Sequence, residues 1–212
     1  MPQPVVVVLA AGSGSRFAGQ APAAGHKLAQ PFAATTVLGS TVAAVRQSGL
    51  PFVVVTIPAL FCVASVEAAE RDIVMLAADD DKELPGTYGM GHSIAAGVSA
   101  RPQAPGWLVL PGDMPLVQPA SLRAVAAALG EHRIAYAQHR GRRGHPVGFR
   151  AELFAELAAL RGDEGARRLV ERHSPCGVEV DDPGVLLDLD TAGDLAVLRA
   201  LHARGRDALE GG

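Results

Sequence analysis

The chain has 212 residues, of which 49% are hydrophobic and 19% charged, and its formal net charge is −3. This length and composition predict one globular domain over residues 1–212. The slight negative charge argues against a nucleic-acid partner, and no apolar run reaches the ~18 residues that a membrane span requires. Two distant cysteines and an N-terminus without a leader pattern are typical of a cytoplasmic protein.

The first stretch of the chain combines a buried strand with a loop of small residues. Residues 5–9 are uncharged and mostly β-branched, which predicts a strand buried on both faces. Small residues follow at 10–14, where exposed N–H groups can form an anion site, and Arg16 and Lys27 are cations suited to phosphate oxygens. The loop is neither a Walker A motif nor a three-glycine dinucleotide fingerprint. On the glycines alone, a tight turn without a ligand is the alternative.

The rest of the chain alternates apolar strands with helical patterns. This order predicts a three-layer α/β/α fold with a mostly parallel sheet. The expected strands cover residues 52–57, 73–76, 107–110, 134–137, 147–149 and 185–189. The expected helices cover residues 36–48, 59–69, 94–100, 121–129, 151–160, 162–173 and 192–203, with a frayed tail after about residue 205. The acidic run at 79–81 is expected to be a solvated loop.

A second glycine-rich segment, residues 86–93, leads into the helix expected at 94–100. The N–H groups at a helix N-terminus favour anions and polar ligand atoms. Gly91, His92 and Ser93 are therefore candidates for contact with a base or ribose. A solvent-facing helix start is the alternative for His92.

The sequence Pro-Gly-Asp-Met-Pro at residues 111–115 follows the fourth expected strand. Open parallel sheets bind ligands beyond the carboxyl ends of their strands. A carboxylate oxygen at that edge suits Mg²⁺ that also contacts phosphate. Asp113 is the resulting candidate, and the alternative is a cap for the helix that begins near Pro119.

A second acidic pair occurs near the end of the last expected strand. Alternate residues of a strand share a face, so Asp188 and Asp190 are expected to project together. Like charges so close together are stable beside a cation. We therefore expect metal ligation by these two residues together with Asp113, and a helix cap from Thr191.

Glycines among basic residues at 139–149 predict a hairpin whose second arm is 147–149. This hairpin is either an exposed basic loop or one side of a site for an anionic acceptor, with His145 in reach of substrate. The segment 162–168 opens another expected helix. Asp163 is either its N-cap or a ligand contact, and Arg167 is either a surface ion-pair partner or a ligand contact.

Together these motifs resemble those of the molybdopterin nucleotidyltransferases, a MobA-like branch of the GT-A-like nucleotidyltransferases, and most closely its molybdenum cofactor cytidylyltransferases. The matches are Leu-Ala-Ala-Gly-Ser-Gly-Ser-Arg-Phe at 9–17 with Lys27, Pro-Gly-Asp-Met-Pro at 111–115, the Gly-x-Pro-Val-x-Phe pattern at 144–149, the Gly-Asp-x-Gly-Ala-Arg pattern at 162–167 and Asp-x-Asp-Thr at 188–191. Two departures are a longer Arg16–Lys27 interval and Ala192-Gly193 in place of Pro-Glu.

The resemblance implies a role for each matched residue. The implied catalytic residues are Arg16, Lys27 and Asp113. The implied ligands of Mg²⁺, or alternatively of Mn²⁺, are Asp113, Asp188 and Asp190. The implied nucleotide contacts are Leu9, Ala10, Ala11, Gly12, Ser13, Gly14, Gly91, His92 and Ser93. The implied acceptor contacts are His145, Pro146, Asp163 and Arg167.

The implied reaction is transfer of CMP from CTP to the phosphate of a molybdopterin-type cofactor, with release of pyrophosphate. Ala11 resembles the residue of the cytidylyltransferase branch, because the guanylyltransferase branch usually has Gly at this position. A molybdoenzyme or its chaperone is the implied protein partner. Two alternatives stay open: another sugar- or alcohol-phosphate nucleotidyltransferase on the same fold, and a non-catalytic nucleotide- or cofactor-binding protein serving a molybdoenzyme.

Overall fold

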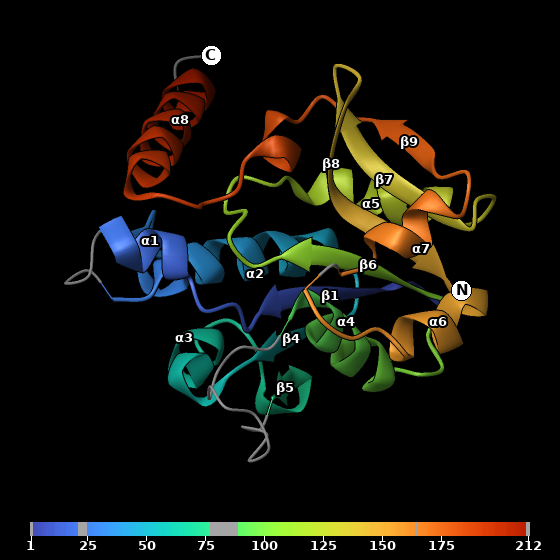
Figure 1. Ribbon diagram of the computed structural model, residues 1–212. Coiled ribbons are helices and arrows are strands. Elements are labelled where there is room, and N and C mark those ends of the chain that lie inside the picture. The colour runs from blue at the N-terminus through green and yellow to red at the C-terminus, as the bar shows by residue number, and fades with distance from the viewer. Residues whose placement is uncertain (1, 21–24, 77–88, 164, 211–212) are drawn as a thin grey trace.

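The computed structural model describes residues 2–20, 25–76, 89–163 and 165–210. Its strands are β1 (Val5–Ala10), β2 (Pro31–Phe32), β3 (Thr35–Thr36), β4 (Phe52–Thr56), β5 (Ile73–Met75), β6 (Gly106–Pro111), β7 (Ile134–His139), β8 (Arg142–Arg150) and β9 (Cys176–Glu179). Seven of them form a sheet in the order β5-β4-β1-β6-β8-β7-β9, and β2 pairs with β3 apart from it (Figure 1).

The main sheet combines a parallel half with a hairpin. β1 runs parallel to β4 and β6, and β4 runs parallel to β5. β8 is antiparallel to both β6 and β7, while β9 runs parallel to β7. Val6, Val7 and Val8 have no exposed surface, because β1 has strands on both sides and helices over both faces. The expected mostly parallel sheet with a buried first strand is confirmed.

Helices cover the two faces of this sheet. They are α1 (Ser15–Gln20), α2 (Val37–Ser48), α3 (Phe61–Ala64), α4 (Met90–Ser99), α5 (Pro119–Ala128), α6 (Phe154–Ala158), α7 (Arg167–Glu171) and α8 (Ala192–Glu210). The first core cluster includes apolar residues of α2, α5 and α8, and the second includes residues of α4, α6 and α7. The three-layer α/β/α architecture is therefore confirmed.

Local signals account for the elements that the sequence predicts well. α2 begins where Thr36 Oγ1 accepts a hydrogen bond from the Gly39 N–H, and it ends at Gly49 in the left-handed conformation, with φ of 75°. The predicted hairpin is the β7–β8 pair. Its turn residues Arg140 and Gly141 both have positive φ, as a two-residue hairpin turn of type I′ requires.

The expected strand at 185–189 is wrong. Residues Pro183–Leu186 form the 3₁₀ turn η6, and no strand includes Asp188 or Asp190. The buried Asp182 carboxylate accepts hydrogen bonds from the Gly184 N–H and from Ser121 Oγ, which fixes a turn there. A Cβ on Gly144 of β8 would lie 2.1 Å from the Val185 carbonyl oxygen, so this segment packs closely against Gly144 of β8.

Three expected helices are shorter than their apolar patterns indicate. The 59–69 segment contains the 3₁₀ turn η3 (Pro58–Leu60) and four residues of α3, and 151–160 divides into the turn η5 (Ala151–Leu153) and α6. The 162–173 segment is helical in α7 alone among its described residues. Conversely, α8 continues to Glu210, past the expected end near 203. The acidic run at 79–81 lies outside the described residues.

Among the described residues, no helix is both long enough and apolar enough to cross a bilayer.

Gly97 allows α4 to contact the sheet closely. A Cβ at this position would lie 2.3 Å from Val7 Cγ1 and 2.9 Å from Val55 Cγ2. We expect Gly97→Ala to destabilise the protein by about 1–3 kcal/mol, because overpacking of a close contact forces the helix off the sheet. Urea unfolding measures this change. Gly19→Ala is the matched control, since nothing lies within 4 Å of its added Cβ, and equal stability of the two variants would contradict the packing argument.

Candidate active site

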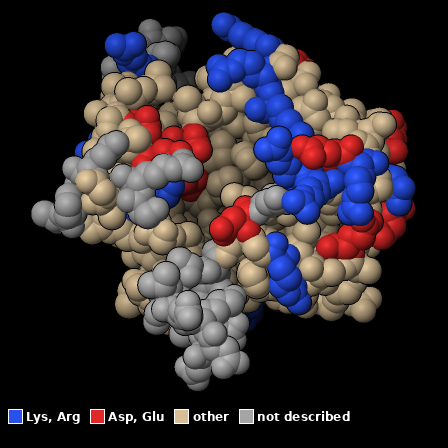
Figure 2. All heavy atoms as spheres, viewed as in Figure 1, with Lys and Arg blue, Asp and Glu red and all other residues tan. Residues whose placement is uncertain are grey.

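A cavity of about 730 Å³ opens at the carboxyl ends of β1 and β6, the edge where parallel sheets bind ligands. Figure 2 shows a hollow on one face, between acidic side chains and a band of basic side chains. The cavity is lined by Leu9, Ala11, Gly12, Ser13, Gly14, Phe17, Lys27, Leu28, Met90, Ser93, Pro111, Asp113, His145, Asp163, Asp188 and Asp190. Most of the expected site residues therefore meet in one place.

Backbone hydrogen bonds join the loops that form this cavity. The Gly112 N–H donates to the Leu9 carbonyl, which ties the loop after β6 to the end of β1 at 2.8 Å. The Leu189 N–H donates to the Asp113 carbonyl at 3.0 Å, which ties residues 188–190, here called the acidic segment, to the same loop. The Thr41 hydroxyl of α2 donates a hydrogen bond to the Gly112 carbonyl oxygen. Three hydrogen bonds therefore fix the backbone of the loop that carries Asp113.

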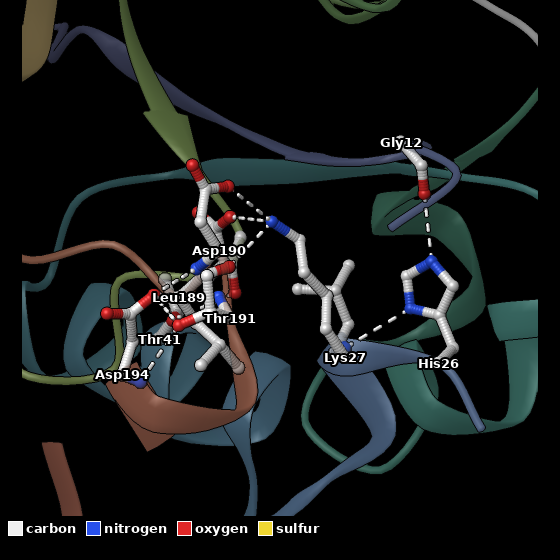
Figure 3. Close-up of polar contacts among 11 residues, drawn as sticks. Gly12, His26, Lys27, Thr41, Leu189, Asp190, Thr191 and Asp194 are labelled. Carbon is white, nitrogen blue, oxygen red and sulfur yellow. Dashed lines mark hydrogen bonds and ion pairs between the residues drawn. The ribbon is translucent and has the colours of Figure 1, made fainter. Parts of the chain in front are cut away.

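The Lys27 ammonium group lies among the acidic residues of the cavity. Its Nζ is 2.6 Å from Asp113 Oδ2, 2.7 Å from the Leu189 carbonyl oxygen and 3.4 Å from Asp190 Oδ1 (Figure 3). The side chains of Lys27 and Asp113 are 14% and 12% exposed, so little solvent screens this ion pair. The Lys27 ammonium group therefore lies between the Asp113 and Asp190 carboxylates, in the position that we expected for a metal cation.

The carboxylates of Asp113, Asp188 and Asp190, here called the acidic cluster, can bind a further cation. Asp113 Oδ1 is buried without a hydrogen-bond partner. Burial raises the pKa of Asp188, and the negative charges of Asp113 and Asp190 raise it further. No group of three or more His, Cys, Asp or Glu among the described residues is arranged to enclose a metal. Mg²⁺ usually takes one or two carboxylates plus substrate phosphates, so the donors present fit such an ion bound together with a nucleotide.

A capping box fixes the end of the acidic segment. The Asp194 N–H donates to Thr191 Oγ1, and Asp194 Oδ2 accepts hydrogen bonds from the N–H groups of Asp190 and Thr191. Both partners thus satisfy backbone donors at the start of α8. These bonds to Thr191 and Asp190 lower the pKa of Asp194. The expected cap at Thr191 is present, and it holds the Asp190 backbone next to Lys27.

His145 lies in the same cavity on β8. Its Nδ1 is buried without a partner, and with Asp113 Oδ1 it is one of two such side-chain atoms among the described residues. Burial lowers the pKa of His145 and the Arg143 guanidinium lowers it further, whereas Asp188 and a backbone hydrogen bond at Val109 oppose the change. His145 is therefore a neutral ring with an acceptor nitrogen left for a ligand donor.

The start of α4 packs against the 161–163 segment. A Cβ on Gly91 would lie 2.7 Å from the Arg161 carbonyl oxygen, so Gly91 is needed for this contact, while His92 Nδ1 accepts a hydrogen bond from the Gly162 N–H. Neither residue lines the cavity. Ser93 and Asp163 do line it, from opposite sides of this contact.

Some expected site residues lie elsewhere. Ala10 is buried in β1 and Pro146 is buried in β8, and neither lines the cavity. Arg167 is exposed on α7, where its Nε lies 2.8 Å from Glu171 Oε1, four residues along the helix. The side chain of Arg16 lies outside the described part of the chain.

Four cavity residues were not among the candidates: Phe17, Leu28, Met90 and Pro111. Phe17, Met90 and Pro111 lie within the quoted motifs and Leu28 directly follows Lys27, which is the signal that could have indicated them. His26 does not line the cavity but bonds to its glycine loop, here defined as residues 12–14, through the Gly12 carbonyl. Nothing in the sequence beyond its place before Lys27 indicates that contact.

Asp188 is expected to lower the stability of the ligand-free fold. Its folded-state pKa is raised, so ionisation at neutral pH is less favourable in the folded than in the unfolded chain. Asp188→Asn should therefore raise the free energy of unfolding at pH 7, measured with urea in chelator, and the gain should vanish well below pH ~3.9, where the unfolded carboxyl is also protonated. The exposed Asp181, changed to Asn, is the control. A less stable Asp188→Asn protein at pH 7 would contradict this account.

Comparison with known proteins identifies a matching family and related sequences. Residues 6–176 match the family model described as MobA-like NTP transferase domain. Purine catabolism protein PucB of Bacillus subtilis is 32% identical over 116 residues, which are 52% of this chain and 56% of that protein. The chain therefore spans about half the length of that relative.

Solved structures match over nearly the full chain. Rv0371c of Mycobacterium tuberculosis is 31% identical with a TM-score of 0.77, covering 94% of this chain and 98% of that one. A further structure of Rv0371c is a complex with manganese, at 30% identity and a TM-score of 0.73, covering 93% and 98% of the two chains. A nucleotidyl transferase from Methanothermobacter thermautotroptrophicus is 26% identical with a TM-score of 0.75, covering 96% and 99%.

The family match covers more than half of the chain, and it includes β1, the glycine loop, Lys27 and Asp113. The solved relatives share the same fold over almost all of their lengths. The chain belongs to the MobA-like NTP transferase family.

Proposed function

We propose that this nucleotidyltransferase transfers CMP from CTP to the phosphate of a molybdopterin-type cofactor in the cytoplasm, with release of pyrophosphate. The observation that carries the proposal is one cavity lined by the glycine loop after β1, by Lys27, by Asp113 after β6 and by Asp188 and Asp190 of the acidic segment. A backbone nest on one side and carboxylates on the other suit a triphosphate with its cation. The glycine loop would receive the phosphates through its N–H groups.

Asp113, together with Asp188 or Asp190, would hold a divalent cation. The unpartnered Asp113 Oδ1 and the raised pKa of Asp188 support this assignment, because both describe negative charge that is not fully compensated. When bound, the cation neutralises phosphate charge and orients the triphosphate. Mg²⁺ is our first choice, with Mn²⁺ as the alternative.

The chain's own residues account for the remaining requirements of the reaction. An oxygen of the acceptor phosphate attacks the α-phosphorus, a new P–O bond forms, and the bond to pyrophosphate breaks. The attacking phosphate is already anionic at neutral pH, so no general base is required. Lys27 stabilises charge on the departing pyrophosphate, after leaving the carboxylates that it contacts in the ligand-free protein.

The opposite side of the cavity is the proposed acceptor side. The neutral His145 ring and the Asp163 carboxylate both offer hydrogen-bond acceptors there. Such groups suit the N–H donors of a pterin better than its phosphate. The choice of cytosine depends on Ala11, a buried residue that lines the cavity.

Pyrophosphate release tests the proposed reaction. We expect release with CTP, but not with GTP, ATP or UTP, when each is supplied with Mg²⁺ and molybdenum cofactor. Asp113→Ala should reduce the rate at least ~100-fold, because it removes a group that organises charge in the transition state. Asp181→Ala, which changes an exposed carboxylate outside the cavity, should keep the wild-type rate.

Each other outcome has a defined meaning. Release with a different nucleotide would keep the reaction class and overturn the cytosine assignment. Release only with a sugar or alcohol phosphate as acceptor would overturn the molybdopterin assignment. Nucleotide binding without release under any condition would overturn the enzyme claim in favour of a protein that delivers nucleotide or cofactor to a molybdoenzyme.

Lys27 is expected to compete with a divalent cation in the absence of nucleotide. A unit charge at ~4 Å contributes about 4 kcal/mol at an effective dielectric constant near 20, so its removal should tighten Mn²⁺ binding by at least tenfold. Isothermal titration of Mn²⁺ into Lys27→Met and wild-type protein measures the difference. Arg143→Gln is the control, because it removes one cation from β8 without a contact to the acidic cluster.

An unchanged or weaker Mn²⁺ affinity in Lys27→Met would contradict this competition. The double variant Lys27→Met/Asp113→Asn should lose the gain, which locates the bound ion. Lysine occurs only at positions 27 and 82 of the sequence. NMR of lysine-labelled wild-type protein therefore provides a second readout, in which Mg²⁺ addition should shift the Lys27 signal.

A further inference from the structure

His26 connects the glycine loop to the turn that carries Lys27. Its Nε2 lies 2.8 Å from the Gly12 carbonyl oxygen, and its Nδ1 lies 3.2 Å from the Leu28 nitrogen (Figure 3). The second contact caps the 3₁₀ turn η2 (Lys27–Ala29). One half-buried ring thus bonds to two backbone segments that border the cavity.

The two contacts fix the tautomer of this ring. The Leu28 N–H can only donate, so Nδ1 must be the acceptor, and the Gly12 carbonyl can only accept, so Nε2 must carry the proton. A doubly protonated ring would place two N–H groups against each other at Leu28. The geometry therefore requires neutral His26 with hydrogen on Nε2.

The electrostatic surroundings favour the same neutral form. Burial lowers the pKa of His26, the hydrogen bond to Gly12 opposes that change, and the adjacent Lys27 ammonium lowers the pKa further. At neutral pH the ring therefore carries no charge that would compete with Lys27 for anions. Its contribution is to hold the backbone.

The contact at Gly12 sets the direction of the glycine loop. In a trans peptide the C=O and the following N–H point in opposite directions. With the Gly12 carbonyl bonded to His26, the Ser13 N–H is directed away from the ring. Gly14, with φ of 62°, then passes so near that a Cβ there would lie 3.3 Å from His26 Nε2 and 3.4 Å from Lys27 Cγ. The ring, the loop and the lysine stem are in mutual contact.

We propose that His26 is a positioning residue that fixes the glycine loop in its nucleotide-binding conformation through the Nε2–H to Gly12 bond. This inference rests on the proposed role of that loop in triphosphate binding. It assigns a function to a residue that does not line the cavity, and it makes nucleotide affinity depend on the hydrogen bond to the Gly12 carbonyl.

Two substitutions separate the two contacts of the ring. Asn places an oxygen near the position of Nδ1, so His26→Asn keeps the cap on η2 and loses the bond to Gly12. Gln places an amide N–H near the position of Nε2, so His26→Gln keeps the bond to Gly12 and loses the cap. His173→Asn, which changes a histidine that does not line the cavity, is the control.

Direct titration of CTP in the presence of Mg²⁺ is the primary measurement. We expect His26→Asn to weaken binding about 3- to 10-fold, the range for loss of one organising hydrogen bond, and to raise KM for CTP with kcat nearly unchanged. His26→Gln should stay within about 2-fold of wild type. Equal losses in the two variants, or no loss in His26→Asn, would overturn the proposal.

Hydrogen exchange at residues 12–14 in the nucleotide-free protein is the second measurement. We expect faster exchange in His26→Asn than in His26→Gln, at similar global stability, and equal rates would also overturn the proposal. Because neither titration nor exchange needs turnover, the inference can be tested if no pyrophosphate is released. CTP binding that depends on His26 without transfer would overturn the proposed reaction and leave the positioning role in place.

Discussion

The contact between the Lys27 ammonium and the oxygens around it is the interaction on which the site depends. It joins three parts of the chain that are 86 and 162 or more residues apart in sequence, namely the turn η2, the loop after β6 and the acidic segment. Removing one member of a poorly solvated ion pair leaves an uncompensated charge, which is typically destabilising by about 3–5 kcal/mol. The Lys27 charge therefore stabilises the arrangement of these three segments around the cavity.

This arrangement explains why the cavity contains several unfavourable features at once. Asp113 Oδ1 and His145 Nδ1 lack partners, and Asp188 faces two other carboxylates. Buried polar groups in folded proteins are normally satisfied, so such exceptions concentrate where a ligand completes the structure. The backbone around them is, in contrast, fully bonded at Gly112, Leu189 and Thr191. A rigid frame thus holds side chains that are incomplete without substrate.

The sequence predicts well that the glycine loop and Asp113 meet at one cavity, because these residues directly follow strongly apolar strands. The glycine loop follows β1 and Asp113 follows β6, and adjacent parallel strands place both at one edge of the sheet. The acidic segment was placed in a strand because 185–189 has the apolar pattern of one. The Asp182 turn and the close approach at Gly144 override that pattern, and neither is visible locally. Asp188 and Asp190 nevertheless reach the cavity, brought there by the Leu189–Asp113 bond.

Contacts between distant residues explain the other failures. β9 has only four residues with alternating half-buried and exposed positions, so nothing in Cys-Gly-Val-Glu distinguishes it from a loop. Gly91 resembles a ligand-binding glycine in sequence, whereas it is small because the Arg161 backbone passes over it. His26 acts through a carbonyl fourteen residues earlier, across a fold that must exist before the contact does.

The division of the sheet into a parallel half and a hairpin half has an evolutionary consequence. In the parallel half, β1 is joined to β4 and β4 to β5 by crossover connections that carry helices, so a change of length there moves a helix and the loops at the ligand edge. The β7–β8 pair is closed by the two residues Arg140 and Gly141, and such a hairpin can lengthen, shorten or exchange its tip without altering any crossover. A change of length at this tip therefore leaves the glycine loop and the loop that carries Asp113 in place. One architecture can in this way be retained across transferases whose second substrates differ.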